Sequence, residues 1–111
     1  MTTSTLVTER NQECLKTTAS CSQACEACAY ACTESGVGSA ECVQACLDCA
    51  AICQLTQTLL ARGSRYAEQL CKLCADACEA CATECERYND AAFKACAEAC
   101  RSCAKECRSM I

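Results

Sequence analysis

Apolar positions recur along this chain at alternating intervals of four and three residues, and cysteine occupies most of them. Four segments repeat one phrase, in which successive cysteines are four, three and four residues apart. Residues at these intervals lie above one another on one face of an α-helix, where a helix bundle has its packing seam. We therefore predict four helices, each with a stripe of thiols on its inner face. The stripes are Cys21, Cys25, Cys28 and Cys32; Cys42, Cys46, Cys49 and Cys53; Cys74, Cys78, Cys81 and Cys85; and Cys96, Cys100, Cys103 and Cys107.

Short polar segments separate the stripes and mark the ends of the helices. Gly36 and Gly63 interrupt the chain after the first and second stripes, in a sequence without proline. Ser39, Ser64 and Asn89 have side chains suited to capping the helices that follow. The predicted helices span about residues 5–34, 39–62, 64–87 and 89–109.

The second half of the chain repeats the first. Adding 53 to the numbers of the first stripe gives the third, and adding 54 to those of the second gives the fourth. A duplicated helical hairpin with short loops predicts antiparallel neighbours. We expect one domain over residues 1–111, of the all-α class: an antiparallel up-down four-helix bundle with a cysteine-lined core.

The two ends of this core are expected to differ. Cys32, Cys42, Cys85 and Cys96 fall at the end that holds the first and third loops, so sulfur is expected to rim the core there. Apolar residues are expected to plug the opposite end, with Cys14 nearby. These residues are Leu55, Leu59, Leu60, Tyr66, Leu70 and Met110.

Charge and hydropathy exclude several partners. The formal net charge is −4, with acidic and basic residues interspersed, which argues against nucleic acid and anionic membrane surfaces. No apolar stretch is long enough to span a membrane, so we expect no membrane association. The first 16 residues have neither the basic nor the apolar region of an export signal, and a cytoplasmic location is expected.

The 18 cysteines are open to two interpretations, disulfide scaffold or free thiols. Helical neighbours three or four residues apart have side-by-side Cβ vectors that fit disulfide geometry poorly. A reducing cytosol also leaves thiols free. Bridges between helices stay an alternative, but free thiols are favoured.

Closely spaced free thiols in a chain without histidine indicate all-sulfur metal binding. A Cu(I) ion that displaces one thiol proton leaves the charge of the core unchanged, whereas a zinc ion with four thiolates carries −2 and is costly to bury without cations. Cu(I) is therefore favoured, with zinc or cadmium sequestration as the alternative. The looped cysteine run and proline of ferredoxin-type iron–sulfur proteins are absent.

The four in-register cysteine phrases resemble those of the cytosolic bacterial copper storage proteins over about residues 14–107. The resemblance implies a store of many Cu(I) ions and a homotetramer of bundles. It also implies that every cysteine is a Cu(I) ligand: Cys14, Cys21, Cys25, Cys28, Cys32, Cys42, Cys46, Cys49, Cys53, Cys71, Cys74, Cys78, Cys81, Cys85, Cys96, Cys100, Cys103 and Cys107.

Two other classes of function are less consistent with the sequence. An enzyme with a thiol nucleophile needs a base or a depressed pKa, and no histidine is present to serve as the base. We therefore expect no enzyme. A purely structural core of cysteine would pack less well than leucine and would oxidise. Outward apolar residues, among them Val43, Leu47, Ile52, Leu55 and Leu73, predict packing between bundles.

Overall fold

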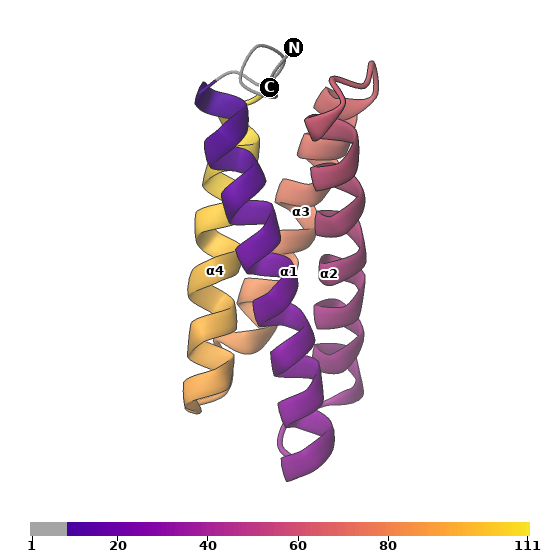
Figure 1. Cartoon of the computed structure of the whole chain (residues 1–111). Helices are drawn as coiled ribbons and strands as arrows, with labels where there is room; N and C mark the ends of the chain where they lie inside the picture. The colour runs from indigo at the N-terminus through magenta and orange to yellow at the C-terminus, as the bar shows by residue number, and fades with distance from the viewer. Residues whose placement is uncertain (1–8) are drawn as a thin grey trace.

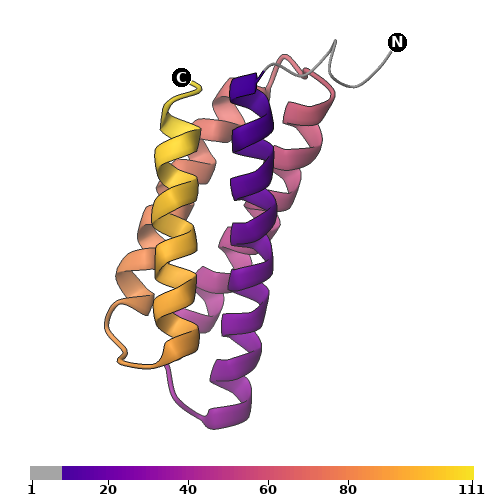
Figure 2. The same ribbon diagram turned by 60° about the vertical axis from the view of Figure 1, so that its left-hand side comes forward.

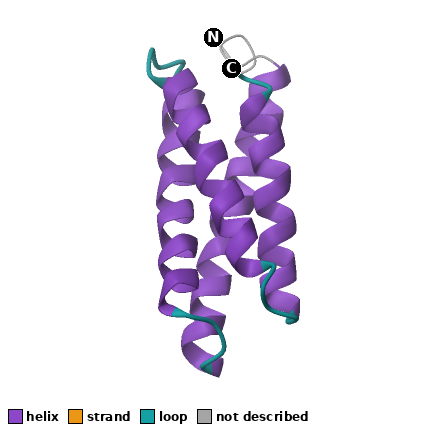
Figure 3. Ribbon diagram, turned by 180° about the vertical axis from the view of Figure 1, so that it is seen from behind, coloured by secondary structure: helices purple, strands orange, loops and turns teal. Residues whose placement is uncertain are grey.

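A computed structural model describes residues 9–111 and shows four antiparallel α-helices arranged around a single core (Figure 1). The helices are α1 (Glu9–Ser35), α2 (Ala40–Ala61), α3 (Ala67–Cys85) and α4 (Ala91–Arg108). Each helix packs against its two neighbours in an up-down order, α1 against α2 and α4, and α3 against α2 and α4. The described residues contain no strand (Figure 3). The predicted all-α bundle is confirmed, and residues 5–8 of the predicted first helix lie outside the described range.

The two ends of the bundle are made of different helix ends and loops. The start of α1, the end of α4 and the α2–α3 loop lie at one end, and the α1–α2 and α3–α4 loops lie at the other (Figure 2). We call these the α2–α3 end and the Phe93 end, after the residue that closes the second. None of the described helices is long and apolar enough to cross a bilayer.

Side-chain caps set the starts of two helices. Ser39 accepts a hydrogen bond from the backbone N–H of Cys42 at 3.1 Å, as predicted. The cap of α4 is Asp90, whose carboxylate accepts from the N–H of Ala92 at 2.9 Å, so the prediction of Asn89 was wrong by one residue. Ser64 does not cap α3, because its hydroxyl accepts from Tyr66 within a turn and the helix begins only at Ala67.

Glycine ends two of the helices in the left-handed conformation. Gly36 has a φ of 72° and Gly63 a φ of 66°. After α2, the N–H of Gly63 bonds to the carbonyl of Leu60 and the N–H of Ser64 to that of Leu59, which is the Schellman pattern. These turns are tight, so α1 and α2 run antiparallel, as do α2 and α3.

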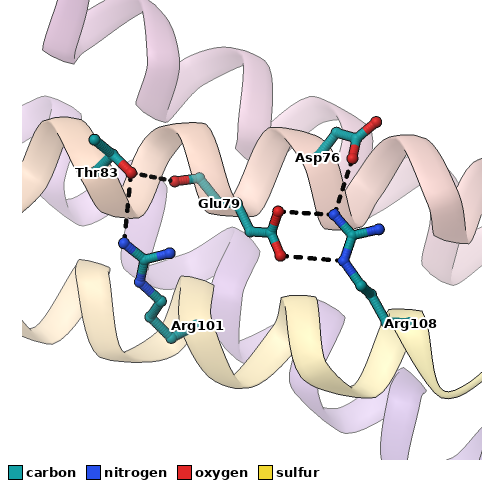
Figure 4. Close-up of polar contacts among 5 residues, drawn as sticks. All are labelled: Asp76, Glu79, Thr83, Arg101 and Arg108. Atoms are coloured by element: carbon teal, nitrogen blue, oxygen red, sulfur yellow. Dashed lines mark hydrogen bonds and ion pairs between the residues drawn. The ribbon is translucent and has the colours of Figure 1, made fainter.

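Surface ion pairs join α3 to α4 (Figure 4). The guanidinium of Arg108 lies 3.0 Å from the carboxylate of Asp76 and 2.7 Å from that of Glu79. Arg101 pairs with Glu86 at 2.7 Å, and it also donates to the hydroxyl of Thr83. Because all these groups are half-exposed, they orient the two helices more than they stabilise the bundle.

Candidate metal centre

The core of the bundle is built mainly of sulfur. All 18 cysteines are buried free thiols, and only Cys32 retains any exposure, at 5%. The three-and-four spacing turns each stripe inward, and the remaining buried residues are mostly alanine, which fits between the stripes. The structure therefore has a core of free thiols and not a disulfide scaffold. The predicted cysteine-lined core is confirmed.

Thiols from different helices lie in van der Waals contact across the core. The sulfurs of Cys21 on α1 and Cys100 on α4 are 3.6 Å apart. Cys49 on α2 and Cys78 on α3 are also separated by 3.6 Å. The longest of these sulfur contacts are 4.0 Å, as between Cys49 and Cys100. The sulfurs thus form a continuous column rather than isolated pairs.

The column contains overlapping groups of four sulfurs, all within 4.8 Å of one another. Of the five groups named below, one takes a single thiol from each helix, and the other four combine three helices. Neighbouring groups share members: Cys21 and Cys49 belong to two groups, as do Cys25, Cys78 and others. Shared ligands suit a chain of linked metal ions, because a thiolate that bridges two ions serves both. Five of these groups are Cys21, Cys49, Cys53 and Cys78; Cys21, Cys25, Cys49 and Cys100; Cys25, Cys81, Cys96 and Cys100; Cys28, Cys46, Cys85 and Cys96; and Cys53, Cys74, Cys78 and Cys103.

Among residues 11–111, no lysine or arginine is buried beside the sulfur column to balance negative charge. Every lysine and arginine from residue 11 onward has an exposed side chain. The ion pairs of the described residues are all on the surface. A monovalent metal ion, which neutralises one thiolate charge per ion, therefore fits this interior best.

The model of the family described as copper storage protein matches residues 7–111. The chain belongs to the copper storage protein family. Solved structures of the family superimpose closely on it. Apo-Csp3, copper storage protein 3 of Bacillus subtilis, is 37% identical, with 89% of this chain and 96% of that chain covered and a TM-score of 0.83.

Two further solved structures are described as containing copper. The Cu(I)-bound copper storage protein BsCsp3 is 36% identical, with 92% of this chain and 98% of that chain covered and a TM-score of 0.84. A cytosolic copper storage protein from Streptomyces lividans, with five coppers, is 34% identical, with 92% of each chain covered and a TM-score of 0.83. Recognition of the family from the cysteine phrases is confirmed.

The Phe93 end of the column is closed by an aromatic plug, which the sequence analysis did not predict. Phe93, in the first turn of α4, is 1% exposed. Its ring stacks on that of Tyr88 with centroids 4.7 Å apart. A Cβ atom at Gly38 would lie 3.0 Å from the sulfur of Cys32 and 3.2 Å from the tip of the Phe93 ring, so glycine permits close packing here. The thiols expected to rim this end are buried, and the expectation that sulfur forms its outer rim was incomplete because Phe93 closes it.

The α2–α3 end is closed in a different way, although its thiols are fully buried as well. Of the six residues predicted to plug it, only Leu60 is buried, whereas Leu55 and Tyr66 are 49% and 54% exposed. A surface cavity of about 330 Å³ reaches the core here and is lined by Leu60, Gly63, Cys71 and Met110, among others. Cys71 is thus the one thiol among the residues that line this cavity, although its side chain is fully buried.

Three thiols at the α2–α3 end form a hydrogen-bonded group. The sulfurs of Cys14 and Cys107 are 3.8 Å apart. Hydrogen bonds from Cys107 and Cys14 lower the pKa of Cys71 to about 4. At the opposite end, burial, followed by the charge of Cys85 and Cys32, raises the pKa of Cys42 to about 12. Burial also raises the pKa of Cys28. At the Phe93 end, hydrogen bonds from Cys46 and Cys100 also lower the pKa values of Cys85 and Cys96, respectively, so each end of the column holds a readily ionised thiol.

Two threonines interrupt the thiol stripes near the α2–α3 end. Thr18 and Thr56 are fully buried. Their hydroxyls donate to backbone carbonyls of their own helices, Thr18 to Cys14 at 2.8 Å and Thr56 to Ile52 at 2.7 Å. Their positions continue the three-and-four intervals of the stripes, a signal that was present in the sequence but was missed. On α1, Thr18 lies between Cys14 and Cys21, and on α2, Thr56 follows Cys53, so a hydroxyl takes the place of a thiol at this level of both helices.

Proposed function

We propose that this protein stores Cu(I), holding many ions along the sulfur column of its core. The observation that carries the proposal is the set of overlapping four-sulfur groups, which are buried, with no buried cation among residues 11–111. Each Cu(I) replaces a thiol proton, so the loaded column stays near neutrality and avoids the cost of burying charge. All 18 cysteines are proposed as ligands, in keeping with their burial in one connected core.

Zinc or cadmium sequestration is the weaker candidate. A zinc site with four thiolates needs its own tetrahedral set of ligands. The sulfur groups in this core share members, so separate tetrahedral sites cannot fill all of them at once. Each such site would also bury a charge of −2 with every lysine and arginine from residue 11 onward on the surface. The same geometry therefore favours the monovalent ion.

Three further features belong to the proposal. We infer a storage role without catalysis, since a store needs ligands rather than a reactive centre. A cytoplasmic location is supported by the description of the Streptomyces lividans relative as cytosolic. A homotetramer of bundles is inferred from the resemblance to the family and from the exposed apolar residues Leu47, Leu55 and Leu73.

The test is a titration of the reduced, metal-free protein with Cu(I) in the presence of a competing chelator of known affinity. Storage predicts that many ions bind per chain before the chelator takes up copper. Saturation at one or two ions would contradict storage and would favour transfer or sensing of copper. A parallel titration with Zn²⁺ should give weaker and fewer sites, and a higher zinc capacity would favour the alternative.

A further inference from the structure

Two buried threonines occupy positions of the sulfur column where the cysteine intervals would place thiols. Thr18 lies between Cys14 and Cys21, four residues after the first and three before the second. Thr56 follows Cys53 by three residues. Each hydroxyl donates its hydrogen to a backbone carbonyl of its own helix, and a hydroxyl oxygen is a hard donor that Cu(I) binds poorly beside thiolates. At these two positions the side chain is therefore no ligand for Cu(I).

The two threonines lie at about the same level of the bundle, on its α1–α2 side. The amide of Gln54 on α2 donates to the hydroxyl of Ser22 on α1 at 3.0 Å, which matches the levels of the two helices. Thr18 precedes Ser22 by four residues. Thr56 follows Gln54 by two, and because the helices are antiparallel both steps lead towards the α2–α3 end. Hydroxyls thus replace sulfur on two adjacent helices at one level.

The gap in the α1 stripe is too long for one metal ion to cross. Cys14 and Cys21 are seven residues apart, a rise of about 10 Å along the helix axis. A metal–thiolate bond of about 2.3 Å lets one ion join two sulfurs at most about 4.6 Å apart. On α2 the stripe of thiols stops, because Thr56 and then Leu60 occupy the positions that follow Cys53. Neither helix therefore gives copper a continuous row of thiols at this level.

The α3 and α4 stripes continue through the same level without a gap. The sulfurs of Cys103 and Cys107 on α4 are 4.0 Å apart. On α3, Cys71 and Cys74 are three residues apart, so they lie on one face with a rise of about 4.5 Å. Cys74 and Cys103 share a four-sulfur group with Cys78, which continues into the rest of the column. Each of these steps is within reach of one bridging ion.

We propose that Cu(I) passes between the cavity beside Cys71 and the rest of the sulfur column on the α3–α4 side alone, through Cys74 and Cys103. Thr18 and Thr56 close the α1–α2 side to copper. The proposal rests on copper storage, and it adds the route by which the store is filled and emptied. In each transfer the ion gains a bond to the incoming sulfur and loses one to the outgoing sulfur. The proton of the incoming thiol moves to the outgoing thiolate, so no electron is transferred and the charge of the core is unchanged.

The experiment measures the rate at which bathocuproine disulfonate withdraws copper from the loaded full-length chain, followed by the absorbance of the chelator complex. Thr18→Cys/Thr56→Cys supplies the missing thiols on α1 and α2, so withdrawal is expected to be about threefold faster than from the native protein. The matched control is Thr18→Val/Thr56→Val, which removes the hydroxyls without adding sulfur and should keep the native rate. A native rate in the cysteine variant, or equal acceleration in the valine variant, overturns the proposal.

Interruption of the α3–α4 side tests the same route in the opposite sense. Cys74→Ser/Cys103→Ser removes the two linking thiols, and withdrawal should slow about tenfold. The matched control is Cys32→Ser/Cys42→Ser at the Phe93 end, which removes the same number of thiols and should keep the native rate. A native rate in the first variant, or equal slowing in the second, contradicts the route.

A rescue separates the route from a general disturbance of the core. The two threonine-to-cysteine changes, added to the chain with the interrupted α3–α4 side, should restore the rate because they supply a path on the α1–α2 side. Absence of restoration in a folded chain, checked by circular dichroism, overturns the proposal. The threonine variants decide alone if the serine variants do not fold. A low copper capacity of the native protein refutes storage itself, whereas a high capacity with unchanged withdrawal rates refutes the route alone.

Discussion

The two ends of the sulfur column are closed in different ways. At the Phe93 end, one buried ring stacked on Tyr88 covers the thiols. At the α2–α3 end, Leu60 and Met110 border a cavity that reaches Cys71. Single thiols differ as well: burial raises the pKa of Cys42 to about 12, and hydrogen bonds from Cys107 and Cys14 lower that of Cys71 to about 4. The pKa values do not divide the two ends, however, because hydrogen bonds from Cys46 also lower that of Cys85 at the Phe93 end. The comparison distinguishes a lid, formed by Phe93 and Tyr88, from a mouth, the cavity beside Cys71. We expect copper to enter and leave at the mouth.

Removal of the lid should have the largest effect on stability. Phe93→Ala deletes a buried ring and leaves a cavity above Cys32, so the free energy of unfolding of the metal-free protein should fall by about 3–5 kcal/mol. Urea unfolding followed by circular dichroism measures this loss. The control Tyr30→Ala removes an exposed ring and should change the value by less than about 0.5 kcal/mol. Equal effects of the two variants would show that Phe93 is not a plug.

The raised pKa values at the lid predict a loss of stability at high pH. Cys42 ionises near its ordinary value of 9.0 in the unfolded chain but only at about 12 in the fold. Its contribution to stability is therefore complete below pH 9 and is lost as the pH rises towards 12. The Tm of the reduced, metal-free protein should fall across this window. Cys42→Ala should flatten the decline, and an identical decline in that variant would contradict the assigned cause.

The mouth should control the rate of copper uptake. Cys71→Ser removes the thiol that ionises most readily at the cavity, so uptake should slow about tenfold, because the thiolate is the form that binds metal. Stopped-flow absorbance of the copper–thiolate band measures the rate. Cys42→Ser at the lid removes one ligand as well, but it should leave the rate unchanged. Slower uptake in Cys42→Ser than in Cys71→Ser would contradict this prediction, because it would place the entry of copper at the Phe93 end.

The ion pairs between α3 and α4 should have the smallest effect. Arg108→Ala removes surface contacts with Asp76 and Glu79 that join α4 to α3 and close neither end of the column. Because these groups are half-exposed, the Tm of the metal-free protein should drop only slightly at low salt and not at all at high salt. Lys105→Ala is the control, since Lys105 makes no ion pair with the described residues. A large drop that persists in high salt would show a packing role instead.

The repeated cysteine phrase was sufficient to predict the bundle and its core. Its intervals put every thiol on an inner helix face, and the structure buries each of them. The intervals also continue past the cysteines to Thr18, Thr56 and Phe93, positions that a pattern of cysteines alone does not include. The lid could therefore have been found in the sequence, since Phe93 precedes Cys96 by three residues.

Other features depend on packing that the intervals do not encode. Leu55 and Tyr66 are apolar and lie near the mouth, yet both point outward, because their positions fall off the cysteine stripe of their own helix or in a loop. The helix boundary at Ala67 follows from the turn that Ser64 forms with Tyr66, which competes with capping of α3. The difference in pKa between Cys42 and Cys71 could not be predicted from the intervals, because it depends on how thiols from several helices are placed around each of them.

Anomalous scattering at the copper absorption edge, from crystals loaded with Cu(I), tests the central claim most directly. The account predicts a row of copper peaks inside the bundle, each bonded only to cysteine sulfur and following the overlapping groups from Cys28 to Cys74. Peaks confined to the surface, or a core without copper beside unmodified thiols, would contradict it.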